Sequence, residues 1–150
     1  MKVLVTLITY EDWVWSHPNP ALVANYMLPG GDAFTKEVVS ITHLAEKGWH
    51  ADPSPTEIDW LAVTVPARRL HLINGKLARI ADRPAYLPVT VEAVLNQKVG
   101  EYLNRAGHLV GHSPGGGRKA FAVNLTQGAD ARWRIINIFP IHMPSTKTGT

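Results

Sequence analysis

The last third of the chain contains the stretch that decides the fold, residues 118–139, RKAFAVNLTQGADARWRIINIF. Two runs rich in β-branched and aromatic residues, 118–126 and 132–139, flank the turn-forming sequence QGAD. Apolar and polar residues alternate along both runs, so Trp133, which stands between two arginines, is expected to face a core. The pattern predicts two antiparallel strands joined by a tight turn.

The same alternation of period two continues upstream to about residue 57. Large aliphatic residues alternate with other side chains over residues 60–65. Asn74-Gly75 separates two apolar runs within residues 70–80 and is typical of a β-hairpin, because both positions of its turn need positive φ. Residues 86–96 predict another strand, and residues 99–104 and 108–111 flank a further turn.

The first fifty residues have a helical period instead. Over residues 3–15 the apolar residues recur three and four apart, with Glu11 in the same stripe. Asn19 before Pro20 is typical of a helix start and predicts a short helix over 20–28.

A third helix is predicted over residues 33–48. Phe34, Val38 and Ile41 lie along one face of it, and Glu37 is assigned with the other charged residues to the opposite face. Gly48 is expected to end this helix in the left-handed conformation.

Helices first and strands second imply an α+β domain. We expect three N-terminal helices packed on one strongly curved antiparallel sheet of five or six strands, a cone of the cystatin type. The single domain would span residues 1–144, and the small polar residues 145–150 would form a flexible tail.

The charge of the chain is unevenly distributed. Residues 1–60 contain three basic and eight acidic residues, whereas residues 61–150 contain twelve basic and four acidic ones. The two parts are expected to attract one another in the folded chain. The bases are scattered, with no run of five, which disfavours nucleic acid as a partner.

Composition excludes several classes of protein. Of the 150 residues, 45% are hydrophobic, which is too many for a disordered chain. The lack of cysteine excludes a disulfide scaffold, thiolate metal sites and a cysteine nucleophile. His108 and His112 would be ~13 Å apart in a strand, too far to share an ion. We therefore expect no metal and no cofactor.

The N-terminus resembles the start of a signal peptide, because Lys2 precedes the apolar residues 3–9. Charged residues follow directly, without a small-residue cleavage site, and no apolar run reaches the ~18 residues of a membrane span. We expect a cytoplasmic protein. The alternative is a membrane anchor removed from a longer chain.

Two segments resemble the superfamily named after nuclear transport factor two, which includes the SnoaL-like proteins. One is the helix 33–48 with its Lys-Gly-Trp ending, followed by a strand, and the other is the hairpin with Trp133-Arg134-Ile135. Residues 20–26 and Leu28-Pro29-Gly30 resemble small bacterial members. The resemblance implies a cone-shaped α+β domain, on which enzymes, ligand binders and interaction modules all occur.

Members of this superfamily that are enzymes build an acid–base site inside the cone. The corresponding parts here would be Asp59 as a general base, with Tyr26 or His71 as its partner. The side chains expected to line the ligand pocket are Trp60, Tyr102, Phe121 and Trp133.

We predict a non-enzymatic binding or assembly module, since no established catalytic motif is present beside an aromatic-rich, charge-divided surface. It would form a homodimer or join a larger assembly, or bind a protein partner or a small apolar ligand. The alternative is an isomerase, hydratase or cyclase that uses Asp59. A third hypothesis is an anion or nucleic-acid binder, in which the glycine-rich residues 113–117 would act with Arg118 and Lys119.

Overall fold

Two long helices open the chain and a short one connects them: α1 (Lys2–Ser16), η1 (Pro20–Asn25) and α2 (Asp32–Lys47). The structure is a computed structural model that describes residues 2–52, 55–66, 79–80, 83–84, 88–113 and 116–143. Within this part of the chain, neither long helix is long and apolar enough to cross a membrane.

Helix α1 confirms the helical period of residues 3–15. Its buried residues are Leu4, Leu7, Ile8 and Val14, which share one face of a 3.6-residue helix. The β-branched residues are tolerated because burial of this stripe outweighs their weak helix propensity of a few tenths of a kcal/mol.

The connecting segment η1 confirms the predicted start and corrects the predicted end. The side chain of Asn19 accepts a hydrogen bond of 3.0 Å from the Ala21 amide, and Pro20 occupies the first turn. The segment is a 3₁₀ helix that ends at Asn25 instead of continuing to residue 28. It stops because Met27 forms a parallel bridge with Ile135 in a strand, which requires extended backbone.

Helix α2 ends as expected at Gly48. This residue has φ +68°, and the Trp49 amide donates a 3.0 Å hydrogen bond back to the Leu44 carbonyl. At the other end, Gly31 is the N-cap residue and Asp32 is already helical.

Four strands form the main sheet, in the order β2 (Glu57–Val65), β5 (Val89–Gln97), β8 (Gly117–Gln127) and β9 (Trp133–Ile141). All neighbours pair antiparallel. The predicted final hairpin is therefore confirmed as β8 and β9, with Trp133 in its second strand.

The other strands do not join this sheet. Strands β1 (His50–Ala51), β6 (Glu101–Leu103) and β7 (Leu109–His112) form a separate three-stranded sheet, in the order β1-β6-β7. Two-residue strands β3 (Arg79–Ile80) and β4 (Arg83–Pro84) pair with each other. The prediction of three helices on a single sheet of five or six strands is therefore wrong.

Close backbone approaches explain why the sheets separate. A Cβ on Gly116 would lie 2.7 Å from a methyl carbon of Val99, and one on Gly100 would lie 2.9 Å from the hydroxyl of Ser113. The segments after β5 and before β8 lie side by side at these glycines, where the Ser113 amide donates a hydrogen bond to the Gly100 carbonyl, and the β6–β7 hairpin pairs with β1. Upstream, Pro55 has no N–H to extend the ladder of β2 towards β1.

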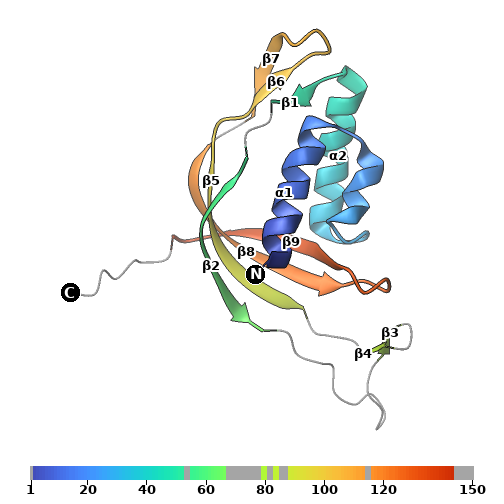
Figure 1. Ribbon diagram of the computed structural model, residues 1–150, viewed down its shortest axis with the longest axis vertical. Coiled ribbons are helices and arrows are strands. Elements are labelled where there is room, and N and C mark those ends of the chain that lie inside the picture. The colour runs from blue at the N-terminus through green and yellow to red at the C-terminus, as the bar shows by residue number, and fades with distance from the viewer. Residues whose placement is uncertain are drawn as a thin grey trace, which may run out of the picture.

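The helices lie against the concave side of the curved main sheet (Figure 1). Inward residues of the strands, among them Val91, Val123 and Ile135, join Leu4 of α1 and Ile41 of α2 in one core. The hairpin predicted around Asn74-Gly75 and the predicted tail 145–150 lie outside the described residues, except for Arg79 and Ile80.

Candidate functional site

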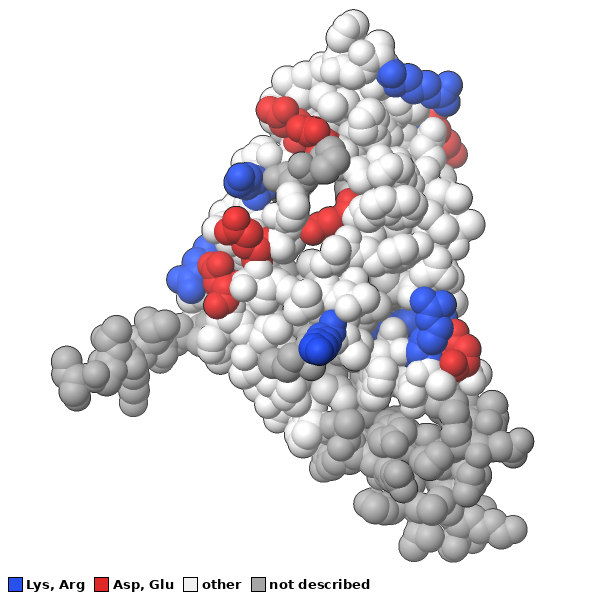
Figure 2. All heavy atoms as spheres, viewed as in Figure 1, with Lys and Arg blue, Asp and Glu red and all other residues white. Residues whose placement is uncertain are grey.

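A cavity of about 310 Å³ opens between the C-terminal half of α1 and the junction of the two sheets. We call it the α1 cavity. Figure 2 shows acidic side chains in and around a hollow on the face that carries α1. Its lining residues are Glu11, Asp12, Trp15, Ala51, Asp52, Thr56, Gln97, Lys98, Gly100, Tyr102, Ser113, Gly116 and Lys119.

Glu11 at the cavity wall is hydrogen-bonded to Glu37 of α2, and we call these two residues the carboxyl pair. One oxygen of Glu37 also accepts hydrogen bonds from the indole N–H of Trp15 at 2.6 Å and from the hydroxyl of Tyr26 at 3.0 Å. Because three donors converge on Glu37, it is the ionised member. Glu11 therefore carries the proton that the pair shares.

Burial and charge keep that proton in place. Burial raises the pKa of Glu11 well above its usual range, and the neighbouring charges of Glu37 and Asp12 raise it further. Burial also raises the pKa of Glu37, although the hydrogen bonds from Trp15, Tyr26 and Glu11 oppose this. The pKa of the Tyr26 hydroxyl is raised by burial and by the charge of Glu37. The pair is thus a partly desolvated group of two carboxyls, both with raised pKa, beside a cavity.

Aromatic side chains adjoin the carboxyl groups, because Trp15 lies on α1 four residues after Glu11 and Tyr102 also lines the cavity. The rings of Trp15 and Tyr102 lie nearly parallel, with their centroids 6.4 Å apart. Next to them, the carboxylate of Asp12 accepts hydrogen bonds of 2.8 and 2.9 Å from the backbone N–H and hydroxyl of Thr56. The cavity therefore combines an apolar wall with carboxyl groups in fixed positions.

A second feature is the convex side of the main sheet, which we call the outer sheet face. The strand registers align Trp60, Val94, Ala120 and Ile141 in one apolar row across all four strands, in which Val94 and Ala120 are already buried and Trp60 is exposed. The next row contains Ala62, Glu92, Ala122 and Phe139. None of the described helices covers this face (Figure 1).

Polar residues flank the two rows. On one side, the Thr90 hydroxyl donates to Asn124 and the Asn124 amide donates to Asn137, each at 2.6 Å. On the other side, Arg118 forms a 2.9 Å ion pair with Asp59. The outer sheet face thus has an apolar centre with a polar rim.

The predicted catalytic residues lie apart. Asp59 is held by Arg118 at the edge of the outer sheet face, whereas Tyr26 is completely buried against Glu37. The structure does not bring these two side chains together. His71 lies outside the described residues.

The predicted pocket residues are also divided. Tyr102 lines the α1 cavity, and Trp60 stands 41% exposed on the outer sheet face. Phe121 and Trp133 pack against the core from β8 and β9, and Phe121 also lines a small inner cavity of about 110 Å³.

Glu11 and Glu37 were not among the predicted site residues, although their spacing in the sequence carried a signal. Glu11 stands in the apolar stripe of α1. Glu37 is three residues after Phe34 and four before Ile41, on the core side of α2. Its assignment to the opposite, solvent face was wrong, because Trp15 and Tyr26 reach it there.

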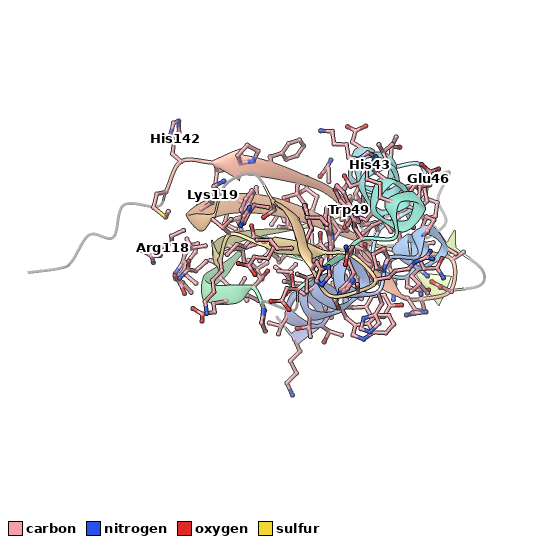
Figure 3. All side chains as sticks on the ribbon, turned by 90° about the horizontal axis from the view of Figure 1, so that it is seen from above. His43, Glu46, Trp49, Arg118, Lys119 and His142 are labelled. Carbon is pink, nitrogen blue, oxygen red and sulfur yellow. The ribbon has the colours of Figure 1, made fainter. Side chains whose placement is uncertain are left out.

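Of the glycine-rich segment 113–117 predicted to act with Arg118 and Lys119 in an anion site, residues 114 and 115 lie outside the described residues. Figure 3 shows Arg118, Lys119 and His142 at the end of the sheet away from helix α2, with His43 and Glu46 on α2. Arg118 is occupied by Asp59, and this ion pair joins the acidic first part of the chain to the basic second part.

Comparisons with known proteins bear on the fold alone. No protein-family model and no curated protein sequence matches the chain. Among solved structures, the intermembrane space region of the chloroplast protein ARC6 is similar, with a TM-score of 0.55 over 93% of this chain and 92% of that one. The two sequences are 8% identical, so the likeness shows a shared arrangement of the backbone.

Proposed function

We propose that this protein is a non-enzymatic assembly module that pairs with a second copy of itself through the outer sheet face. The observation that carries the proposal is the exposure of two aromatic side chains, Trp60 and Phe139, on a face that no described helix covers. The proposal includes a scaffold of the nuclear transport factor two type, supported by helices that precede and cover an antiparallel sheet.

The area of the face suits a second copy. Four strands ~4.8 Å apart and about nine residues long at ~3.3 Å per residue cover roughly 600 Å² in projection. A stable interface buries ~800 Å² of accessible surface per partner, and a pleated face with side chains has more surface than its projection. The face therefore approaches the size that a dimer needs.

The chemistry of the face fits the same role. Trp60 and Phe139 are 41% and 47% exposed. Complete burial of both would stabilise a complex by about 2 kcal/mol per side chain. The polar rows on either side can keep water contact at the rim of such an interface.

The oligomeric state tests the proposal. Light scattering coupled to gel filtration should give the wild-type chain a mass of twice 16.5 kDa at micromolar concentrations. Phe139→Glu should yield a monomer, because the interface would lose an exposed aromatic ring and gain a carboxylate that is desolvated without a partner.

The matched control is Val39→Glu on α2, where the side chain is 66% exposed away from the sheet. It introduces the same charge and should leave the dimer intact. A monomeric wild-type chain, or dissociation of both variants, would count against the outer sheet face as the interface.

A further inference from the structure

We propose that the α1 cavity binds a small organic ammonium ion, with its charge against Glu11 and its hydrocarbon part against Trp15 and Tyr102. This site lies on the helix side of the main sheet and does not depend on the outer sheet face. It is therefore a ligand site beyond the proposed assembly function.

The size of the cavity limits the ligand. About 310 Å³ lies at the lower end of the range for small-molecule pockets. It suits a molecule of roughly ten non-hydrogen atoms, such as an arylalkylamine, and is too small for a peptide or a nucleotide chain.

The charge that is held in a fixed position at the cavity is negative, which favours a cation as the ligand. Glu11, Asp12 and Asp52 line the cavity, and Thr56 holds the carboxylate of Asp12 in place. Lys98 and Lys119 also belong to the lining, but both are exposed. Their long stems let the ammonium groups extend into water, whereas the carboxyl groups of α1 are fixed.

The aromatic wall strengthens this selection. The faces of Trp and Tyr rings attract ammonium groups, and their surface accepts the hydrocarbon part of an amine. Trp15 is held in place by its hydrogen bond to Glu37, so this wall is formed before a ligand arrives. An anion could pair only with the exposed Lys98 and Lys119, whose ammonium groups also reach water.

The carboxyl pair couples binding to proton release. Glu37 already accepts from Trp15, Tyr26 and Glu11, so an incoming cation meets Glu11 as the accessible member. The protonated Glu11 carboxyl gives its proton to the buffer and becomes a carboxylate beside the ligand's ammonium group. The ligand's charge thus replaces that of the proton, and no covalent bond to carbon is made or broken.

Calorimetric titration of the full chain with 2-phenylethylammonium chloride tests the proposal, with 3-phenylpropionate as the anionic counterpart. We expect saturable binding of the ammonium ion and at least ~10-fold weaker binding of the carboxylate. Affinity should rise with pH by up to about tenfold per unit while Glu11 is protonated, because one proton leaves on binding. The observed heat should change with the ionisation enthalpy of the buffer.

Glu11→Gln is the decisive variant, because the amide still donates towards Glu37 but cannot become negative. It should weaken binding of the ammonium ion at least ~10-fold and abolish the dependence on buffer. Glu46→Gln, the same substitution at an exposed residue of α2 outside the lining, should bind like the wild type.

Three results would overturn the proposal: no saturable binding of the ammonium ion, equal binding of the carboxylate, or unchanged affinity in Glu11→Gln. The Phe139→Glu variant separates this site from the dimer. It should bind the ammonium ion as the wild type does even where it is monomeric.

Discussion

At the scale of single residues, Glu37 organises the N-terminal half of the molecule. Its carboxylate connects three segments, since the donors Trp15, Tyr26 and Glu11 come from α1 and from the end of η1. Because Glu37 is only partly buried, these hydrogen bonds offset the free energy that its carboxylate loses on leaving water. The shared proton of Glu11 is therefore part of the fold as well as of the cavity.

The raised pKa of Glu11 predicts a pH dependence of stability. A carboxyl whose pKa is higher in the folded than in the unfolded chain binds more protons when folded, so stability falls as pH rises from ~4.3 through the folded-state pKa. The raised pKa of Glu37 acts in the same direction. Glu11→Gln removes the first contribution, so its stability relative to the wild type should increase between pH 4 and pH 8.

Urea denaturation at several pH values measures this difference. Glu46→Gln serves as the control and should follow the wild type at every pH. A constant difference between Glu11→Gln and the wild type across the range would show that Glu11 is already ionised in the folded chain.

At the scale of elements, the start of α2 is fixed by a close contact with β9. A Cβ at Gly31 would lie 2.7 Å from the carbonyl oxygen of Ile136, which is backbone and cannot rotate away. Gly31→Ala should therefore lower the free energy of unfolding by about 2 kcal/mol through overpacking.

Gly107→Ala in the β6–β7 turn serves as a comparison, because its loss of stability would come from backbone conformation and not from a close contact. Gly107 has φ +79° and open space around it, so the substitution costs ~1 kcal/mol for conformation alone. Thermal or chemical denaturation of both variants checks the order. A smaller loss for Gly31→Ala than for Gly107→Ala would contradict the close contact.

Elements defined by local periodicity could be predicted from the sequence. Both long helices, the Asn19 and Gly48 caps and the hairpin of β8 and β9 follow from patterns within about fifteen residues. The division into two sheets could not be predicted in this way. It depends on the contacts of Gly100 with Ser113 and of Gly116 with Val99. Only the fold brings these residues together.

The candidate site was likewise predicted only in part from the sequence. Tyr102 was selected as a pocket residue and lines the α1 cavity, but the carboxyl pair combines two helices that are separated by a turn and η1. No spacing within one helix reveals that Glu11 and Glu37 face each other. The available signal was the position of the two glutamates relative to the apolar stripes: Glu11 was interpreted as part of the stripe of α1, and Glu37 was assigned to the opposite face of α2.

At the scale of the whole molecule, one charge opposes the proposed dimer. Glu92 stands between Ala62 and Ala122 on the outer sheet face, and a two-fold interface would bring two copies of it close together. Glu92→Gln removes this repulsion and should tighten the dimer by roughly three- to tenfold, since like charges at this range cost about 1 kcal/mol.

Sedimentation equilibrium of the wild type and Glu92→Gln measures the two dissociation constants. Glu57→Gln, on β2 at the margin of the face, is the control and should change the constant less. Equal dissociation constants for Glu92→Gln and the wild type would place Glu92 outside the contact.

Helix α1 is tied by two consecutive residues to different partners, Glu11 to α2 and Asp12 to Thr56 beside the sheet. Such a pair of ties resists both rotation of the helix about its axis and sliding along it. The shape of the cavity is then set during folding, so binding of a ligand costs little conformational entropy of the protein. We therefore expect the association rate to be limited by diffusion of the ligand through the opening. Differences in affinity among ligands should then appear in their dissociation rates.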